Sequence, residues 1–323
     1  TSLGNSLVFI ALSIGLGFSF AITPLIAESD GEGNAEKGRG IFQHGLILST
    51  ILGVVMVVML FFLKPILYHL DQPEEVVLLA IPYYEIVALS MLPLMIFQGF
   101  KQFADGLSET KYSMYAIFMA NVVHIFFNYV LIYGIWIFPK LGILGAALGT
   151  VISRIMMVVF MHYILKYDKS IKSYFKNFSF KEIKKSVLKK IINLGTPSAM
   201  QMLFEVSLFT GAIWLSGSIG KTSQAANQIA LTLATMTFMF AMGLSVAATI
   251  RVGNNKGLMD YKNLIIVARS VFICTIRLET IFGLLFVILH NFLPHLFLNM
   301  ENVNQAIENK EVIVIASKLL LVA

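Results

Sequence analysis

Long apolar segments with few charges dominate this chain and restrict what it can fold into. About eight of them can cross a bilayer as helices, since roughly 20 apolar residues span the hydrocarbon core; they lie at residues 7–27, 44–63, 76–97, 112–136, 143–165, 191–215, 224–250 and 264–289. A ninth begins near Val312 and runs to Ala323. No segment shows the alternation of a barrel strand. The pattern predicts an all-α integral membrane protein with about eight complete transmembrane helices and part of a ninth.

The composition excludes several other classes. Hydrophobic residues make up 57% of the 323 residues and charged residues 13%, whereas a soluble domain carries about 25% charged residues. A single cysteine, Cys274, cannot form an internal disulfide. The net charge of +6 lies in connecting segments rather than on one surface, so we expect no nucleic-acid partner.

The basic residues predict the orientation in the membrane. Nine lysines lie within residues 166–190, namely Lys166, Lys169, Lys172, Lys176, Lys181, Lys184, Lys185, Lys189 and Lys190. The positive-inside rule assigns this stretch to the cytoplasm. Counting spans from there places further basic residues on the same side: Lys37, Arg39, Lys101, Lys111, Arg251, Lys256 and Lys262. We therefore predict a multi-pass inner (plasma) membrane protein with a cytoplasmic linker at 166–190.

The linker also contains a helix signal. Ser179 and Glu182 have the spacing of a capping box. Apolar residues then recur at helical spacing from Phe180 to Ile191, with lysines opposite. A calmodulin target could have this pattern, but both flanks enter the membrane, which favours an amphipathic helix at the cytoplasmic interface.

A weak internal repeat relates two parts of the chain. A shift of about 220 residues matches Phe18 with Phe238, Phe20 with Phe240, Ala21 with Ala241, Ala27 with Ala247, and Gly33-Asn34 with Gly253-Asn254. Both copies leave the membrane on the cytoplasmic side, which is typical of transporters built from two parallel halves. The second copy is preceded by the span at 191–215. We therefore expect an equivalent span before Thr1, six helices in each half, and a chain that is an internal fragment.

Glu205 is the sharpest candidate for a functional residue. It lies about 14 residues beyond Ile191, about 21 Å along a helix, and so well inside the apolar slab. A carboxylate there must face a cavity, a partner or a cation, or else be protonated. It could bind H⁺, Na⁺ or a cationic solute, or it could be a protonated structural group bonded to a neighbouring helix. Gln201, one turn earlier, could line the same cavity.

Other polar residues inside spans have simpler interpretations. Arg277 and Glu279 are two apart and cannot pair on a helix, so we assign them structural roles. Glu85 lies near the outer surface and is interpreted as interfacial. The arginines inside spans, Arg154, Arg269 and Arg277, are expected near cytoplasmic ends, from which their side chains can reach water.

Further motifs point to helix packing rather than to chemistry. Gly145 and Gly149 have the GxxxG spacing of close helix contact. The amides of Asn121, Asn128 and Asn227 are expected to bridge helices more often than to bind substrate. The six histidines form no metal motif, and Gly31-x-Gly33 follows no strand. We therefore expect no enzyme, no cofactor and no metal site beyond a coupling Na⁺ at Glu205.

Several stretches resemble one family of transporters. The stretches "QFADGLSETKYSMYAIFMANVVHIFFNYVLIYG", "LGILGAALGTVISR", "QAANQIALTLATMTFMFAMGLSVAATIRVGN" and "PLIAESDGEGN" are similar to segments of the multidrug and toxic compound extrusion (MATE) transporters. The similarity extends over nearly all of the chain. Asn227 stands where the family usually has histidine, Ala241 where it usually has proline, and Arg277 has no expected counterpart.

The resemblance implies a fold of two bundles around a central cavity. Residues 1–165 would form the N-terminal bundle with family helices two to six, residues 166–190 the linker, and residues 191–323 the C-terminal bundle with helices seven to nine and the start of ten. It further implies a monomeric antiporter that exports cationic, lipophilic drugs in exchange for Na⁺ or H⁺. Glu205 would be the cation-coupling residue, and Gln201 and Asn227 could line the cavity.

Two alternatives remain from the residues. A flippase for lipid-linked oligosaccharide or peptidoglycan precursors should carry cavity arginines and lysines to meet phosphate. A membrane scaffold that transports nothing would need neither the repeat nor a buried Glu205.

Overall fold

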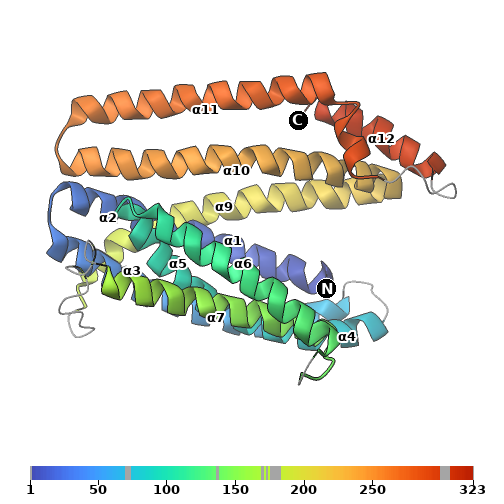
Figure 1. The fold of residues 1–323 in the computed structure, drawn as a ribbon, viewed down its shortest axis with the longest axis horizontal. Helices are drawn as coiled ribbons and strands as arrows, with labels where there is room; N and C mark the ends of the chain where they lie inside the picture. The colour runs from blue at the N-terminus through green and yellow to red at the C-terminus, as the bar shows by residue number, and fades with distance from the viewer. Residues whose placement is uncertain are drawn as a thin grey trace. The chain divides into compact units, whose positions relative to one another are not determined.

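The protein is described here from a computed structural model, drawn in Figure 1. The structure describes residues 2–69, 74–135, 138–168, 171, 174, 183–298 and 306–322. The regular elements of these residues are all helical: α1 Ser2–Ser19, α2 Ile22–Gly31, α3 Ala35–Leu63, η1 Lys64–His69, α4 Glu74–Leu89, α5 Met91–Gly106, α6 Thr110–Tyr133, α7 Ile143–Tyr167, α9 Lys185–Ile219, α10 Lys221–Gly257, α11 Tyr261–Leu289, η2 Leu293–Leu296 and α12 Ala306–Leu320. The all-α prediction is confirmed, and 8 candidate membrane spans occur in the described part of the chain.

Two predicted spans are each divided into two helices. The first span consists of α1 and α2, which are separated at Phe20 and Ala21, and the third consists of α4 and α5, which are separated at Ser90. Pro24 and Pro93 occupy the third position of α2 and α5. A proline lacks the N–H that would bond four residues back, and its ring crowds that carbonyl. The breaks therefore occur where the backbone hydrogen bonding is interrupted.

Other helices begin earlier than the apolar pattern indicates. Helix α3 begins at Ala35 rather than His44, because Oδ1 of Asn34 caps it by accepting the N–H of Lys37 at 2.9 Å. Helix α9 begins at Lys185, so the last residues of the predicted linker are already helical. The capping-box residues Ser179 and Glu182 lie outside the described residues.

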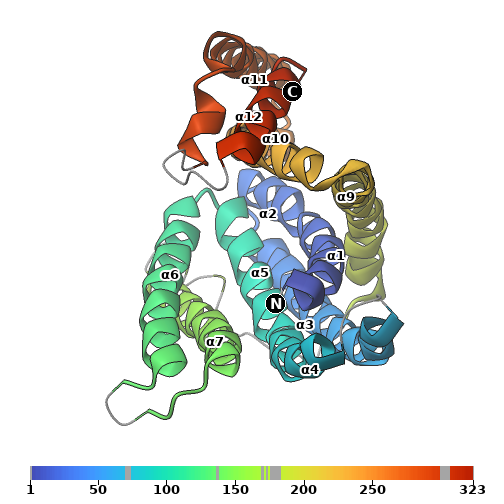
Figure 2. The same ribbon diagram turned by 90° about the vertical axis from the view of Figure 1, so that its right-hand side faces the viewer.

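The described residues form two compact units, and the first comprises Thr1–Phe204 and Gly253–Met259. Helix α5 is its centre and packs on α2, α3, α6 and α7, as Figure 2 shows. Phe42, Phe97 and Phe103 are buried there, and the rings of Phe42 and Phe103 stack with centroids 4.1 Å apart. These aromatic rings anchor the core around α5.

Close packing of α6 and α7 confirms the GxxxG prediction. A Cβ added to Gly145 would lie 2.6 Å from the carbonyl oxygen of Leu131, and one added to Gly149 would lie 2.2 Å from Oδ1 of Asn128. Only glycine permits such an approach. Asn128 and Thr150 both hydrogen-bond His124, at 3.2 Å each, so polar groups also join the two helices.

The second unit comprises Glu205–Val252 and Asp260–Ala323. Its core is formed by α10, α11 and α12, where Ala226, Ile229, Phe286, Val312 and Ala316 are buried. Large apolar side chains are exposed on outer faces of both units, for example Phe118 and Ile125 on α6 and Phe272 on α11. Such faces are suited to lipid, because lipid tails are as apolar as the side chains themselves.

Candidate functional site

Glu205 lies near the middle of α9, a helix of 35 residues. Its side chain is half-buried. The structure assigns it no hydrogen bond or ion pair with any residue that it describes. An acidic group inside a span marks a functional-site hypothesis by default, and the absence of a partner in the described part of the chain leaves the carboxylate available to a cation. Its role in coupling stays a prediction.

The two residues predicted beside Glu205 have different environments. Gln201 lies one turn before it on α9 and is exposed. Asn227 is half-buried on α10 and donates its Nδ2 to Oγ of Ser216 on α9 at 3.2 Å. Asn227 therefore bridges two helices, which is the more frequent role of such amides.

Glu85 has a partner, unlike Glu205. Its Oε1 lies 2.5 Å from Nζ of Lys64, and both side chains are about one-third exposed. This agrees with the interfacial interpretation. In α11, Arg277 is exposed and makes no ion pair with Glu279, and Oε1 of Glu279 is buried without a hydrogen-bond partner among the described residues.

The expected position of Arg154 is wrong. It lies near the middle of α7, not at the cytoplasmic end, and its Nη1 donates to Oγ of Ser90 at 2.5 Å. Ser90 occupies the break between α4 and α5, where the interrupted helix leaves room for a polar contact. The arginine is thus held inside the first unit rather than reaching for water.

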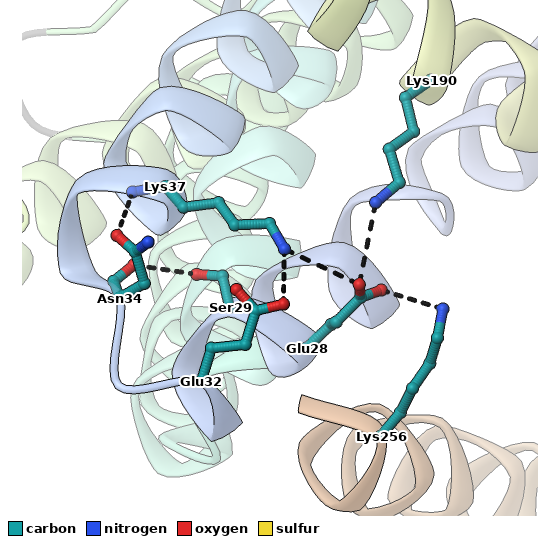
Figure 3. Close-up of polar contacts among 7 residues, drawn as sticks. All are labelled: Glu28, Ser29, Glu32, Asn34, Lys37, Lys190 and Lys256. Carbon is teal, nitrogen blue, oxygen red and sulfur yellow. Dashed lines mark hydrogen bonds and ion pairs between the residues drawn. The ribbon is translucent and has the colours of Figure 1, made fainter. Parts of the chain in front are cut away.

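A charged cluster that the sequence analysis did not single out surrounds Glu28 on α2 (Figure 3). We call Glu28, Lys37, Lys190 and Lys256 the Glu28 cluster. The Glu28 carboxylate lies 3.7 Å from Nζ of Lys37 on α3, 3.8 Å from Nζ of Lys190 on α9 and 3.1 Å from Nζ of Lys256 on α10. One carboxylate therefore connects four helices.

A second carboxylate, that of Glu32, also contacts the Glu28 cluster. Oε1 of Glu32 lies 2.6 Å from Nζ of Lys37, so this lysine contacts two carboxylates. The side chain of Glu28 is 15% exposed and that of Lys256 is 57% exposed. Pairs at this exposure contribute about 0.2–1 kcal/mol each and are weakened by salt.

Next to the Glu28 cluster, α2 and the last turns of α10 pack backbone to backbone. A Cβ added to Gly31 would lie 2.1 Å from the carbonyl oxygen of Asn254, and one added to Gly257 would lie 2.1 Å from that of Glu28. Nδ2 of Asn254 also donates to Oδ2 of Asp30 at 3.1 Å. The two segments that follow the repeat copies, around Gly31 and Gly257, are therefore in direct contact.

Tyr174 adds a hydrogen bond from the linker. Its hydroxyl donates to Oδ1 of Asp30 at 3.3 Å. Burial, reinforced by the adjacent Asp30 carboxylate, raises the pKa of Tyr174 to about 12. The hydroxyl therefore stays protonated, and able to donate, over the physiological range.

Solved structures share this fold. The eukaryotic MATE transporter AtDTX14 superposes with a TM-score of 0.83 at 18% identity, covering 99% of this chain and 69% of that one. An outward-facing MATE family transporter of the MOP superfamily superposes with a TM-score of 0.80 at 19% identity, covering 99% and 71%. The chain thus has the fold of these two proteins, with several helices long enough to cross a membrane.

Sequence comparisons give the family. The MatE family model matches residues 1–130 and 197–323. The probable multidrug resistance protein NorM of Agrobacterium fabrum is 30% identical over 321 residues, which are 99% of this chain and 68% of that protein. The multidrug resistance protein NorM of Vibrio cholerae is 30% identical over 269 residues, 83% of this chain and 58% of that protein. The chain belongs to the MATE family.

Proposed function

We propose that this protein is a secondary active antiporter that exports cationic or lipophilic organic compounds in exchange for inward Na⁺ or H⁺. The observation that carries the proposal is Glu205, an acidic side chain near the middle of a membrane span with no partner among the described residues. Membership of the MATE family and the names of the NorM relatives support the substrate class.

The exchange follows from competition for one carboxylate. A bound Na⁺, proton or organic cation neutralises Glu205, which removes the penalty of moving a charge through the apolar region. An empty, ionised site disfavours the same movement, so the conformational change is coupled to occupancy. Export and ion entry then proceed in alternation.

A transporter of this kind must also close its cytoplasmic side while it is open outside. The contact between α2 and the last turns of α10 is suited to this task, because it joins the exits of the two repeat copies through glycines and the Glu28 cluster. Ion pairs of modest strength permit such a contact to form and separate in each cycle.

The proposal can be tested in proteoliposomes. A fluorescent organic cation should accumulate against its gradient when an inward Na⁺ or pH gradient is imposed, and Glu205→Gln should abolish this accumulation. Glu85→Gln is the matched control, because Glu85 is already paired with Lys64. Accumulation that needs neither gradient, or that survives Glu205→Gln, would contradict the proposal.

Arg154 favours a second candidate, a flippase for phosphate-bearing lipid-linked precursors. A guanidinium in the middle of a span is the kind of group that could meet phosphate. The same liposomes separate the two functions, since a flippase would move a labelled lipid-linked sugar and leave the organic cation where it was.

A further inference from the structure

A basic cavity of about 710 Å³ lies in the first unit between the starts of α3 and α9. Four basic residues line it, Lys37, Arg39, Lys184 and Lys190, together with one acidic residue, Glu36. The lining is therefore rich in positive charge. It suits an anion much better than the organic cations of the proposed function.

The position of the cavity matches the level of lipid headgroups. Its walls are the first turns of α3 and the start of α9, and both helices begin membrane spans at these points, Ala35–Tyr68 and Lys185–Ile219. The positive-inside rule places these ends in the cytoplasm. Anionic phospholipids of the cytoplasmic leaflet bind basic pockets between membrane helices in this way.

The cavity is held open by a fixed scaffold. Nδ1 of His44 lies 2.7 Å from the carbonyl oxygen of Gly40 and donates to it, while Nε2 accepts the backbone N–H of Lys184 at 2.8 Å. His44 is buried, with 2% of its surface exposed. The ring thus joins α3 to Lys184, the residue that precedes α9, and fixes the backbone position from which the Lys184 side chain extends.

Two of the lysines can share an anion with their present partners. The contacts of Lys37 and Lys190 with Glu28 are long, at 3.7 and 3.8 Å, and Glu28 also has Lys256 at 3.1 Å. Lys37 keeps its contact of 2.6 Å with Glu32, and its ammonium group has further N–H donors for a phosphate oxygen. Their side chains are 33% and 47% exposed. Such pairs are individually weak, so a phosphate can share these lysines without leaving Glu28 unpaired.

Apolar side chains complete the cavity. Leu25, Ile41 and Val187 line it beside the basic residues. A soluble anion would not need this surface, whereas the glycerol and first methylene groups of a phospholipid would cover it.

We infer that this cavity binds the phosphate headgroup of an anionic phospholipid from the cytoplasmic leaflet. Lys184 and Lys190 on the α9 side and Lys37 and Arg39 on the α3 side contact the phosphate oxygens, and the apolar wall contacts the glycerol backbone. This site does not depend on the proposed antiport.

The test is lipid retention by the purified protein, measured by native mass spectrometry in micelles that contain equal amounts of phosphatidylglycerol and phosphatidylcholine. The protein should retain phosphatidylglycerol preferentially. The double variant Lys184→Gln/Lys190→Gln should weaken this retention about thirtyfold, because each of the two lysines near an anionic lipid contributes about 1 kcal/mol and about 1.4 kcal/mol is a factor of ten.

The control variant is Lys185→Gln/Lys189→Gln, which removes the same charge from the first turns of α9. Both residues are exposed and do not line the cavity, so its retention should match that of the unaltered protein. Equal retention by the two double variants would overturn the inference.

Two further measurements use only the unaltered protein, so their outcome does not depend on whether a variant folds. Equal retention of phosphatidylglycerol and phosphatidylcholine would overturn the inference. Displacement of phosphatidylglycerol by inorganic phosphate would assign the cavity to a soluble phosphate and so overturn the lipid assignment. Retention that survives added phosphate supports the lipid headgroup.

Discussion

Glu28 and Glu205 are the same residue type in opposite situations. Glu28 lies in the last turn of α2 among three lysines from three other helices. Glu205 lies in the middle of α9 without a partner among the described residues. A carboxylate that is fully paired holds helices together, whereas an unpaired one inside a span must find a cation or a proton. Under the proposed function, Glu28 holds helices together and Glu205 carries the exchange.

The largest expected effect is that of Glu205→Gln on drug resistance. Cells that carry this variant should lose efflux, because an amide cannot exchange a cation for a drug. Growth in the presence of an organic cation measures the loss, and membrane abundance should be unchanged. Resistance equal to that of the unaltered protein would contradict the proposal that Glu205, unlike Glu28, is needed for efflux.

A substitution at Gly257 should disturb the contact that Glu28 stabilises. The new Cβ of Gly257→Ala would lie 2.1 Å from the Glu28 carbonyl oxygen, so α2 and α10 must separate. We expect a loss of about 1–3 kcal/mol, typical of overpacking, visible as a lower unfolding temperature. Gly243→Ala on the same helix is the control, since nothing lies within 4 Å of its Cβ. Equal unfolding temperatures for both variants would show that the contact is loose.

Glu28→Gln should have a smaller effect that depends on salt. It removes three ion pairs of about 0.2–1 kcal/mol each, which are screened as ionic strength rises. Thermal unfolding at low and high salt measures this, and the difference from the unaltered protein should shrink with salt. A difference that stays constant would mean that Glu28 acts through something other than its charge.

The smallest effect concerns Tyr174 at alkaline pH. Its pKa is raised to about 12 from 10.0, so the folded protein keeps a proton that the unfolded chain loses. The stability from this group is therefore full below about pH 10 and is lost as pH rises toward about 12. Tyr174→Phe should lack this part of the alkaline decline in thermal unfolding. Parallel declines for both proteins would contradict the raised pKa.

The membrane spans could be predicted from sequence because apolar length alone decides whether a helix crosses a bilayer. The breaks near Pro24 and Pro93 are harder to predict from sequence, since a proline inside a span can either bend a helix or break it. The prediction for Arg154 is wrong because it rests on the expectation that an arginine inside a span reaches water from a helix end. Ser90, 64 residues away in the chain, supplies a partner that no local pattern reveals.

The two glutamates also differ in how readily each can be found from the sequence. Glu205 could be found from sequence because an acidic residue within an apolar run is visible locally. The Glu28 cluster could not, because its lysines come from α3, α9 and α10. The available signal was that Glu28 and these lysines are all assigned to the cytoplasmic side by the positive-inside rule.

Ion release from the purified protein tests the division between the two glutamates most directly. An organic cation is added to the protein in weakly buffered detergent solution, and released H⁺ or radiolabelled Na⁺ is counted. The unaltered protein and Glu28→Gln should release equal amounts, and Glu205→Gln should release none. Undiminished release from Glu205→Gln, or loss of release in Glu28→Gln alone, would contradict the account.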